Sequence, residues 1–450
     1  MRLKSIDVTN RVLREVSRGS RSITAPAGPS KHCETPSWSK LQGGFEEIDG
    51  QARPTEMIYF DNNATTRVAP EVIAAMQPYL TEFYGNPSSA HSLGRRMKTA
   101  VERAREQVAE LLGAADAREI VFTSCGSESD NWAIRGVLEE DPEKKHIVTT
   151  LVEHEAVRNL CAKLEQQGYE VTWMEVDGRG ELDLESLRAA LRPDTALVSV
   201  MLANNETGVL FPIDEIGRIV RANSSALFHV DGVQAVGKIP IDLSQLEVDL
   251  FALSGHKLHA PQGVGALYVK SGTKLAPFII GGSQESGRRG GTSAVPNIVA
   301  LGAACELAGG PEGHELVRRL RDQLEDEILS QIPNASLNGT PDRTKRLPNT
   351  SNISFEYVEG ENILAHLNEA GILVSTGSAC HSATRESSPT LRAMNVPYTA
   401  AQGSIRFSLG RYNSEQDIEQ TLQILPGIVN KLVKMSPYDK ELQILYAARD

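Results

Sequence analysis

Short apolar runs alternate with segments of helical period from Met57 onward, and this alternation constrains the fold more than any other feature. The apolar runs cover residues 119–123, 146–150, 171–176, 196–201, 226–230, 249–253 and 265–269. The clearest helical segment is 95–112, where apolar residues recur at steps of three and four before Gly113 ends the pattern. Strand–helix alternation of this length predicts an α/β fold with a mostly parallel sheet covered by helices on both faces.

The pattern changes after about residue 310. A long amphipathic helix is expected over 315–332, followed by strands over 352–355, 372–375 and 404–408, with a helix beginning at Glu361. We therefore predict a large domain over 73–312 and a smaller α+β domain over 313–436, with a tail over 437–450. The sequence does not place the segment 57–72 against either domain.

Residues 1–56 differ from the rest of the chain and lack a strong apolar period. Their first 31 residues contain seven Lys and Arg against two Asp and Glu. A disordered tail or sequence upstream of the true start at Met57 is the favoured interpretation, with an organelle transit peptide as the alternative. A secretory signal is not expected, because no apolar core region is present.

Composition excludes several classes of protein. Its 46 basic and 58 acidic residues give a net charge of −12, which argues against binding of nucleic acid through a broad basic surface. No apolar run approaches the length of a transmembrane helix. The five cysteines are scattered without a CxxC pair, which favours neither a disulfide framework nor a metal site. We expect a reducing, cytoplasmic location.

A lysine follows one of the expected buried strands. Lys257 ends the sequence Ser254-Gly255-His256-Lys257, directly after the run 249–253. Open α/β sheets bind ligands at the carboxyl ends of their strands, and a lysine there can form a Schiff base with an aldehyde cofactor. Most lysines are merely solvated, so this motif alone is weak evidence.

Small and hydroxyl residues connect another strand to a helix at 123–131. Gly126 and Ser127 lie in this connection, where backbone N–H groups and the helix dipole favour a phosphate. An ordinary helix N-cap explains the same residues equally well.

Polar side chains also end two further strands. Asp231 ends a buried strand, where a pyridinium N–H would suit an otherwise costly carboxylate, and Gln234 lies three residues further on. His154 follows the strand 146–150 and could stack on an aromatic ring. The alternative interpretations are that Asp231 caps the N-terminus of a helix and that His154 has only a structural role.

Together these pieces resemble the fold-type I pyridoxal-phosphate enzymes, and among them the class V aminotransferase-like cysteine desulfurases of the NifS type. The resemblance covers about residues 57–436. The segments that carry it are 60–66, 84–89, 123–131, 203–208, 254–257, 290–292, 375–380 and 404–411.

The resemblance implies a role for each matching residue around pyridoxal 5′-phosphate. Lys257 matches the Schiff-base lysine, Asp231 the carboxylate that faces the pyridine nitrogen, and His154 the ring-stacking imidazole. The positions expected to hold the phosphate are Gly126, Ser127, Ser254 and His256, with Thr292 reaching the phosphate of the partner subunit in a homodimer.

The resemblance also implies the substrate-facing residues. Asn205 and Gln234 match residues near the phenolic oxygen of the ring, and Asn205 is also expected near the substrate. Arg406 matches the arginine that clamps the substrate carboxylate, as its bidentate geometry would suit. The neighbourhood of Asn62 is expected near the substrate without an assigned role.

Cys380 is the cysteine expected to do chemistry. It lies in a small, hydrophilic run that extends to Pro389, and such a setting exposes a thiol. Cys125 is expected to pack in the phosphate loop, whereas Cys161 and Cys305 lie on helical segments. His381 departs from the threonine that often follows this cysteine, and a Cys-His pair also occurs in selenocysteine lyases.

The implied reaction converts L-cysteine to L-alanine and leaves sulfur on Cys380 as a persulfide. The sulfur would pass to an iron–sulfur scaffold or another acceptor protein, for general or nitrogenase cluster assembly. Three alternatives stay open: a selenocysteine lyase, a catalytically silent scaffold for assembly partners, and a transaminase, which would have no use for Cys380.

Overall fold

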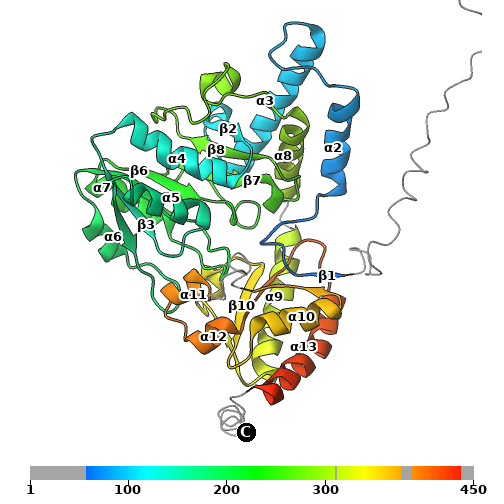
Figure 1. Ribbon diagram of the computed structural model, residues 1–450. Coiled ribbons are helices and arrows are strands. Elements are labelled where there is room, and N and C mark those ends of the chain that lie inside the picture. Colours follow the sequence, from blue (N-terminus) through cyan, green and yellow to red (C-terminus); the bar gives the residue numbers. More distant parts are fainter. Residues whose placement is uncertain (1–56, 310–311, 377–386, 437–450) are drawn as a thin grey trace, which may run out of the picture. The chain divides into compact units, whose positions relative to one another are not determined.

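A seven-stranded sheet forms the centre of the larger part of the chain (Figure 1). The computed structural model describes residues 57–309, 312–376 and 387–436. The strands of this sheet are β2 (Ile120–Thr123), β3 (His146–Thr150), β4 (Glu170–Met174), β5 (Thr195–Ser199), β6 (Leu227–Asp231), β7 (Leu250–Ser254) and β8 (Gly265–Val269). They lie in the order β2-β8-β7-β6-β5-β3-β4.

The mostly parallel sheet predicted from the sequence is confirmed. The neighbours β7, β6, β5, β3 and β4 pair in parallel, whereas β8 runs antiparallel between β2 and β7. Each expected strand is present, with bounds shifted by at most two residues. The parallel strands end on one edge of the sheet, where the candidate site lies.

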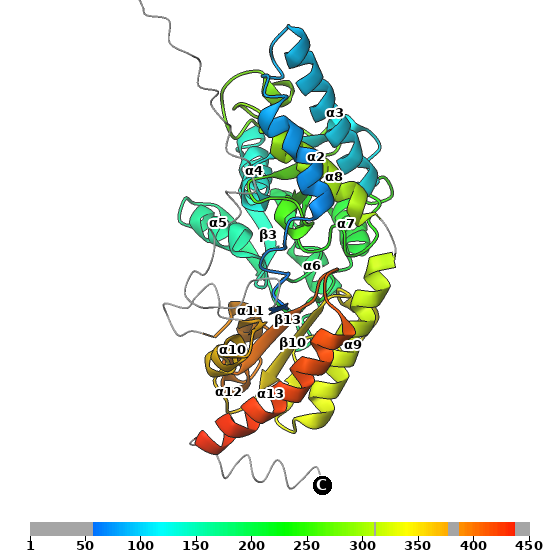
Figure 2. The same cartoon turned by 90° about the vertical axis from the view of Figure 1, so that its right-hand side faces the viewer.

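Helices cover both faces of this sheet because successive side chains of a strand point to opposite sides. Val148, Val198 and Phe251 pack in a core with one set of helices, and Ile147, Leu197 and Leu250 pack with the other. The first set contains α2 (Pro70–Thr81), α3 (Ser92–Leu112), α6 (Leu184–Ala190), α7 (Ile213–Asn223) and α8 (Val295–Ala308), and the second contains α4 (Gly126–Glu140) and α5 (Glu155–Glu165). Figure 2 shows α4 and α5 on the other side of the sheet from α3 and α7.

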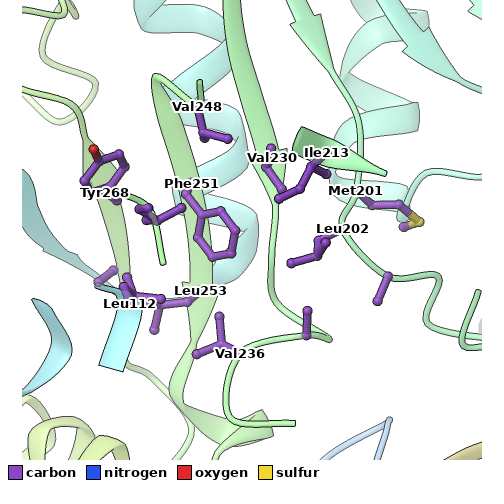
Figure 3. Close-up of a cluster of buried hydrophobic side chains, with 14 of the residues drawn as sticks. Leu112, Met201, Leu202, Ile213, Val230, Val236, Val248, Phe251, Leu253 and Tyr268 are labelled. Carbon is purple, nitrogen blue, oxygen red and sulfur yellow. The ribbon is translucent and has the colours of Figure 1, made fainter. Parts of the chain in front are cut away.

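Buried hydrophobic side chains, among them Phe251, Val230 and Leu253, gather in the core of the large sheet (Figure 3). Phe251 on β7 is fully buried, and burial of a side chain of this size contributes about 1.5–3 kcal/mol. A Cβ atom added to Gly232, which follows β6, would lie 1.9 Å from the ring of Phe251. Only glycine therefore lets the chain turn here directly after Asp231.

A second, smaller sheet has its own core. Its antiparallel strands lie in the order β12-β13-β10-β9 and pack against α9, α10 and α13. The elements of this part are α9 (Glu312–Gln331), β9 (Ala335–Leu337), β10 (Thr350–Phe355), α10 (Gly360–Glu369), β11 (Ile372–Leu373), β12 (Ser375–Thr376), α11 (Pro389–Ala393), α12 (Tyr398–Gln402), β13 (Ser404–Ser408) and α13 (Glu415–Met435). The single strand expected over 372–375 is in fact two strands in different sheets. The domain boundaries stay predictions.

The segment that precedes α2 connects the two parts. Its strand β1 (Ile58–Tyr59) pairs in parallel with β11, and Asp61 forms a bridge with Ser408. A few residues later, the hydroxyl and the backbone N–H of Thr66 both donate hydrogen bonds to the carbonyl oxygen of His256, which follows β7. Residues 61–66 therefore run from the small sheet to the carboxyl edge of the large one.

Candidate active site

A cavity of about 520 Å³ lies where the carboxyl ends of β6 and β7 meet the beginning of α4. The residues predicted from the sequence that line it are Gly126, Ser127, His154, Asn205, Asp231, Gln234, Ser254, His256, Lys257 and Arg406. Segments up to 280 residues apart in the chain thus converge on one cavity.

Lys257 lies in the wall of this cavity, in the short 3₁₀ turn Gly255–Lys257 that follows β7. Its Nζ donates to the carbonyl oxygen of Ala64 at 2.7 Å and to that of Asn63. These two residues of the segment that precedes α2 therefore orient the lysine side chain.

One end of the cavity suits a phosphate. The Ser254 Oγ is buried and has no hydrogen-bond partner among the described residues, which is costly unless a ligand supplies one. α4 begins at Gly126 without a side-chain cap, so its first N–H groups remain available to an anion. A Cβ on Gly126 would lie 2.7 Å from Val233 Cγ2, and glycine keeps this approach open.

His256 adds a neutral donor to this end. Burial and the charge of Lys257 lower the pKa of His256 to about 4, so its imidazole is uncharged at neutral pH. Its Nδ1 lies 3.2 Å from Thr65 Oγ1, which holds the ring in place.

The other end of the cavity holds a buried carboxylate. Asp231, the last residue of β6, accepts a hydrogen bond from the Val233 N–H at 2.9 Å. Burial raises the pKa of Asp231, while the neighbouring His154 and Lys257 favour its anion. A protonated ring nitrogen would satisfy this carboxylate.

Two further acids, which the sequence did not single out, line the same region. Burial raises the pKa of Glu153 to about 8 and that of Asp130 well above its ordinary value, and the charge of Asp231 adds to both shifts. These shifts favour the protonated form of both carboxyls, whereas the nearby His154 and Lys257 favour the anion of Asp231. The sequence could have identified both acids, because Asp130 lies in the 123–131 motif and Glu153 directly precedes His154.

His154 caps the first turn of α5. Its Nδ1 accepts a hydrogen bond from the Ala156 N–H at 3.2 Å, which fixes the imidazole at the cavity wall. Stacking on a ring stays a prediction.

Arg406 is held in place by two groups. Its guanidinium donates to Asp61 Oδ1 at 2.8 Å and to the Asn205 carbonyl oxygen at 3.0 Å, while its buried Nε has no partner in the part of the chain that the structure describes. The sequence did not single out Asp61. A carboxylate that enters the cavity would meet an arginine already oriented by these contacts.

Asn63, rather than Asn62, joins the site. Asn62 donates to the Ser408 and Tyr59 carbonyl oxygens and lines a neighbouring cavity. Asn63 is buried and contacts Lys257, Gln234 and Asn205 through three hydrogen bonds. The sequence pointed to this neighbourhood but not to this residue, because an asparagine run gives no indication of which side chain faces inward.

Two predicted residues are not placed in the cavity. Thr292 lies exposed in the connection between residues 284–287 and α8 and is not among the lining residues. Cys380 lies outside the described residues. Thr376, the last described residue before it, and Pro389, which lies shortly after the next described residues begin at Ser387, line the cavity.

The cysteines on helices are unsuited to nucleophilic chemistry. Cys161 on α5 and Cys305 on α8 are buried, and burial raises the pKa of each thiol to about 12. A thiol that is almost never ionised at neutral pH is a poor nucleophile. Their helical placement agrees with the prediction.

The described part of the chain contains neither a metal site nor a helix that could cross a membrane. None of its groups of His, Cys, Asp and Glu side chains is placed to hold a metal ion. Its helices also lack the combination of length and apolar character that a bilayer crossing requires.

A lysine at a strand end, grouped around one cavity with an uncapped helix start and a buried carboxylate, is typical of fold-type I enzymes, and the chain belongs to their class V aminotransferase-like family. The class-V aminotransferase family model matches residues 58–421. More narrowly, the chain belongs to the cysteine desulfurases, which use pyridoxal 5′-phosphate.

Relatives of known name support this assignment. The chain is 55% identical to cysteine desulfurase 2 of Trichormus variabilis over 86% of its own length and 96% of that protein. It is 51% identical to the cysteine desulfurase NifS of Azotobacter vinelandii over 85% of its length and 94% of that protein. A solved NifS-like protein superposes with a TM-score of 0.79 at 40% identity, covering 84% of this chain and all of the other.

Proposed function

We propose that this cysteine desulfurase uses Lys257, Asp231 and Arg406 to release sulfur from L-cysteine and that Cys380 receives it as a persulfide. The observation that carries the proposal is the convergence of these three residues on one cavity whose wall includes the chain on both sides of Cys380.

The residues that line the cavity support one orientation of the cofactor. Ser254, Gly126 and Ser127 would hold its phosphate, and Asp231 would face its ring nitrogen with His154 beside the ring. When bound there, pyridoxal 5′-phosphate supplies an electron sink for charge that develops at the substrate Cα.

The side chains of the protein then have separate tasks. Arg406 binds the substrate carboxylate, because its guanidinium is already directed at the cavity by Asp61 and Asn205. Lys257 anchors the cofactor and moves the Cα proton through its Nζ.

Sulfur transfer balances without a further reagent. The Cys380 thiolate attacks the substrate sulfur, the S–S bond forms, and the C–S bond breaks with its electron pair left on carbon. Protonation of that carbon yields L-alanine, so carbon is reduced while the sulfur is oxidised to the persulfide level. An acceptor protein, which we propose to be an iron–sulfur scaffold, then takes the sulfur.

Incubation with L-cysteine tests the proposal directly. Without reductant, we expect one sulfur atom to be added to the peptide that contains Cys380, with one alanine released per site. With reductant, alanine and sulfide should appear in equal amounts. Sulfur on another peptide would overturn the assignment of Cys380, and faster turnover of L-selenocysteine would favour the lyase alternative.

We also propose a homodimer in which Thr292 completes the phosphate site of the partner subunit. Thr292 is exposed and away from the cavity of its own chain, which is what a contribution to another chain requires. Several large apolar side chains are also exposed, with Ile280 at 89% and Tyr84 at 77%. Burial of such side chains against a second copy would be favourable.

A further inference from the structure

Lys238 makes two hydrogen bonds directly behind the candidate active site. It lies four residues after Gln234 in the turns that follow β6, and its Nζ donates to Gln234 Oε1 at 2.9 Å and to Asn63 Oδ1 at 3.0 Å. Burial, with the positive charges of Lys257 and Arg406 nearby, lowers the pKa of Lys238 well below its ordinary range. Both oxygens can only accept, so the lysine amine is the donor in each of these hydrogen bonds.

Lys238 faces a different cavity from the one that would hold the cofactor. It lines a neighbouring cavity of about 400 Å³ and is not among the residues that line the candidate active site. Gln234 and Asn63 line the active site and lie between it and the Lys238 amine. Lys257 lines both cavities, but the hydrogen bonds of the Lys238 amine reach the active site through Gln234 and Asn63.

The hydrogen bonds determine which way the Gln234 carboxamide points. Its Nε2 donates at 2.9 Å to the Asn63 carbonyl oxygen, which can only accept. Its Oε1 is occupied by Lys238. The amide nitrogen carries a second hydrogen, and because Gln234 lines the cavity, that hydrogen is available to a ligand.

We propose that Lys238 is a positioning residue that holds the Gln234 carboxamide with an N–H directed at the phenolic oxygen of the cofactor. The proposal rests on the assigned position of Gln234 near that oxygen. Without the amine, Oε1 would lose its buried partner and the carboxamide could rotate, presenting an acceptor instead of a donor.

The phenolic oxygen reports on this arrangement through its ionisation. A donated hydrogen bond favours the anionic form of an oxygen. Loss of one such bond, of ordinary strength, should raise the pH midpoint of the visible absorption change of the bound cofactor by about 0.5–1 pH unit.

The test compares three lysine variants of the loaded enzyme by absorption at varied pH. Lys238→Met keeps the length of the side chain without its donors and should show the raised midpoint. Lys238→Arg keeps donors and should stay close to the wild type. Lys431→Met, an exposed lysine on α13, is the control for loss of a lysine elsewhere.

A double-mutant comparison identifies the route of the effect. In a Gln234→Ala background, Lys238→Met should cause no further shift, because there is no carboxamide left to orient. An equal shift in both backgrounds would show that Lys238 acts directly through its charge and would overturn the proposal. An unshifted Lys238→Met, or a Lys238→Arg that shifts as far as Gln234→Ala, would also overturn it.

The same data separate this inference from the function on which it rests. If Gln234→Ala alone leaves the midpoint unchanged, the position assigned to Gln234 is wrong. If Gln234→Ala shifts the midpoint and Lys238→Met does not, Gln234 keeps its role and Lys238 has none. Should Lys238→Met fail to fold, the comparison of Lys238→Arg with Gln234→Ala still decides the proposal.

Discussion

Replacement of Ser254 with alanine should stabilise the protein without cofactor and weaken its binding of pyridoxal 5′-phosphate. The Ser254 Oγ is buried at the end of β7 and has no hydrogen-bond partner among the described residues. An unsatisfied buried hydroxyl costs about 1–3 kcal/mol, and the alanine variant avoids this cost. We therefore expect a higher urea midpoint for the apoprotein.

The effect on the cofactor has the opposite sign. A hydrogen bond to a charged phosphate contributes about 1.5–3 kcal/mol, so its loss should raise the Kd about 10- to 100-fold. The assay is titration of the apoprotein with pyridoxal 5′-phosphate, followed by absorbance. Pyridoxal, which lacks the phosphate, is the matched ligand and should bind both proteins equally.

Two outcomes would refute this reasoning. A lower urea midpoint for the apoprotein would mean that the hydroxyl already has a stabilising partner. An equal loss of affinity for pyridoxal would mean that Ser254 supports the cavity as a whole rather than the phosphate. Ser271→Ala, at an exposed position, controls for the substitution itself.

Four further predictions concern the chemistry and the assembly. Lys257→Ala should abolish turnover with the fold retained, and mass spectrometry after borohydride reduction of the wild type should find the cofactor on Lys257; attachment elsewhere contradicts the assignment. Cys380→Ser should still bind cofactor and L-cysteine but stop sulfur transfer, because a hydroxyl is far less nucleophilic than a thiol; release of alanine and sulfide at the wild-type rate would make Cys380 a bystander. A chain that starts at Met57 should keep cofactor and activity, since β1 begins only at Ile58; its failure to fold would give residues 1–56 a structural role. Sedimentation should show a dimer, and an active monomer at working concentration would exclude the shared phosphate site.

The order of strands and helices could be predicted from the sequence because it depends on local periodicity. Strands β3, β8 and β13 have the bounds that their apolar runs predicted, and α3 ends at Leu112 before the left-handed Gly113. Helix and strand periods and glycine stop signals act over a few neighbouring residues. The large sheet and the smaller α+β region follow from them.

Pairing between distant strands could not be read in this way. The antiparallel β8 and the division of 372–375 between two sheets depend on hydrogen bonds to partners far along the chain. The sequence of a strand shows its apolar period, but it does not show which strand will pair with it.

In the candidate site too, local sequence motifs could be recognised, whereas contacts between distant segments could not. Lys257, Asp231 and the 123–131 loop were recognisable because each lies at or directly after the end of a buried strand, and the family resemblance supplied Arg406. The contacts of Asn63 and Asp61, however, join the N-terminal segment to residues between 142 and 345 positions away.

By itself, then, the sequence determined the elements, the strand ends that carry reactive side chains, and the chemistry those side chains offer. Only the tertiary structure decided that Asn63 contacts Lys257 and Gln234, that Asp61 orients Arg406, and that burial favours the protonated form of Glu153. The physical reason is that periodicity is a property of neighbouring residues. Burial, pKa and hydrogen-bond partners, in contrast, arise only when distant segments pack together and exclude water.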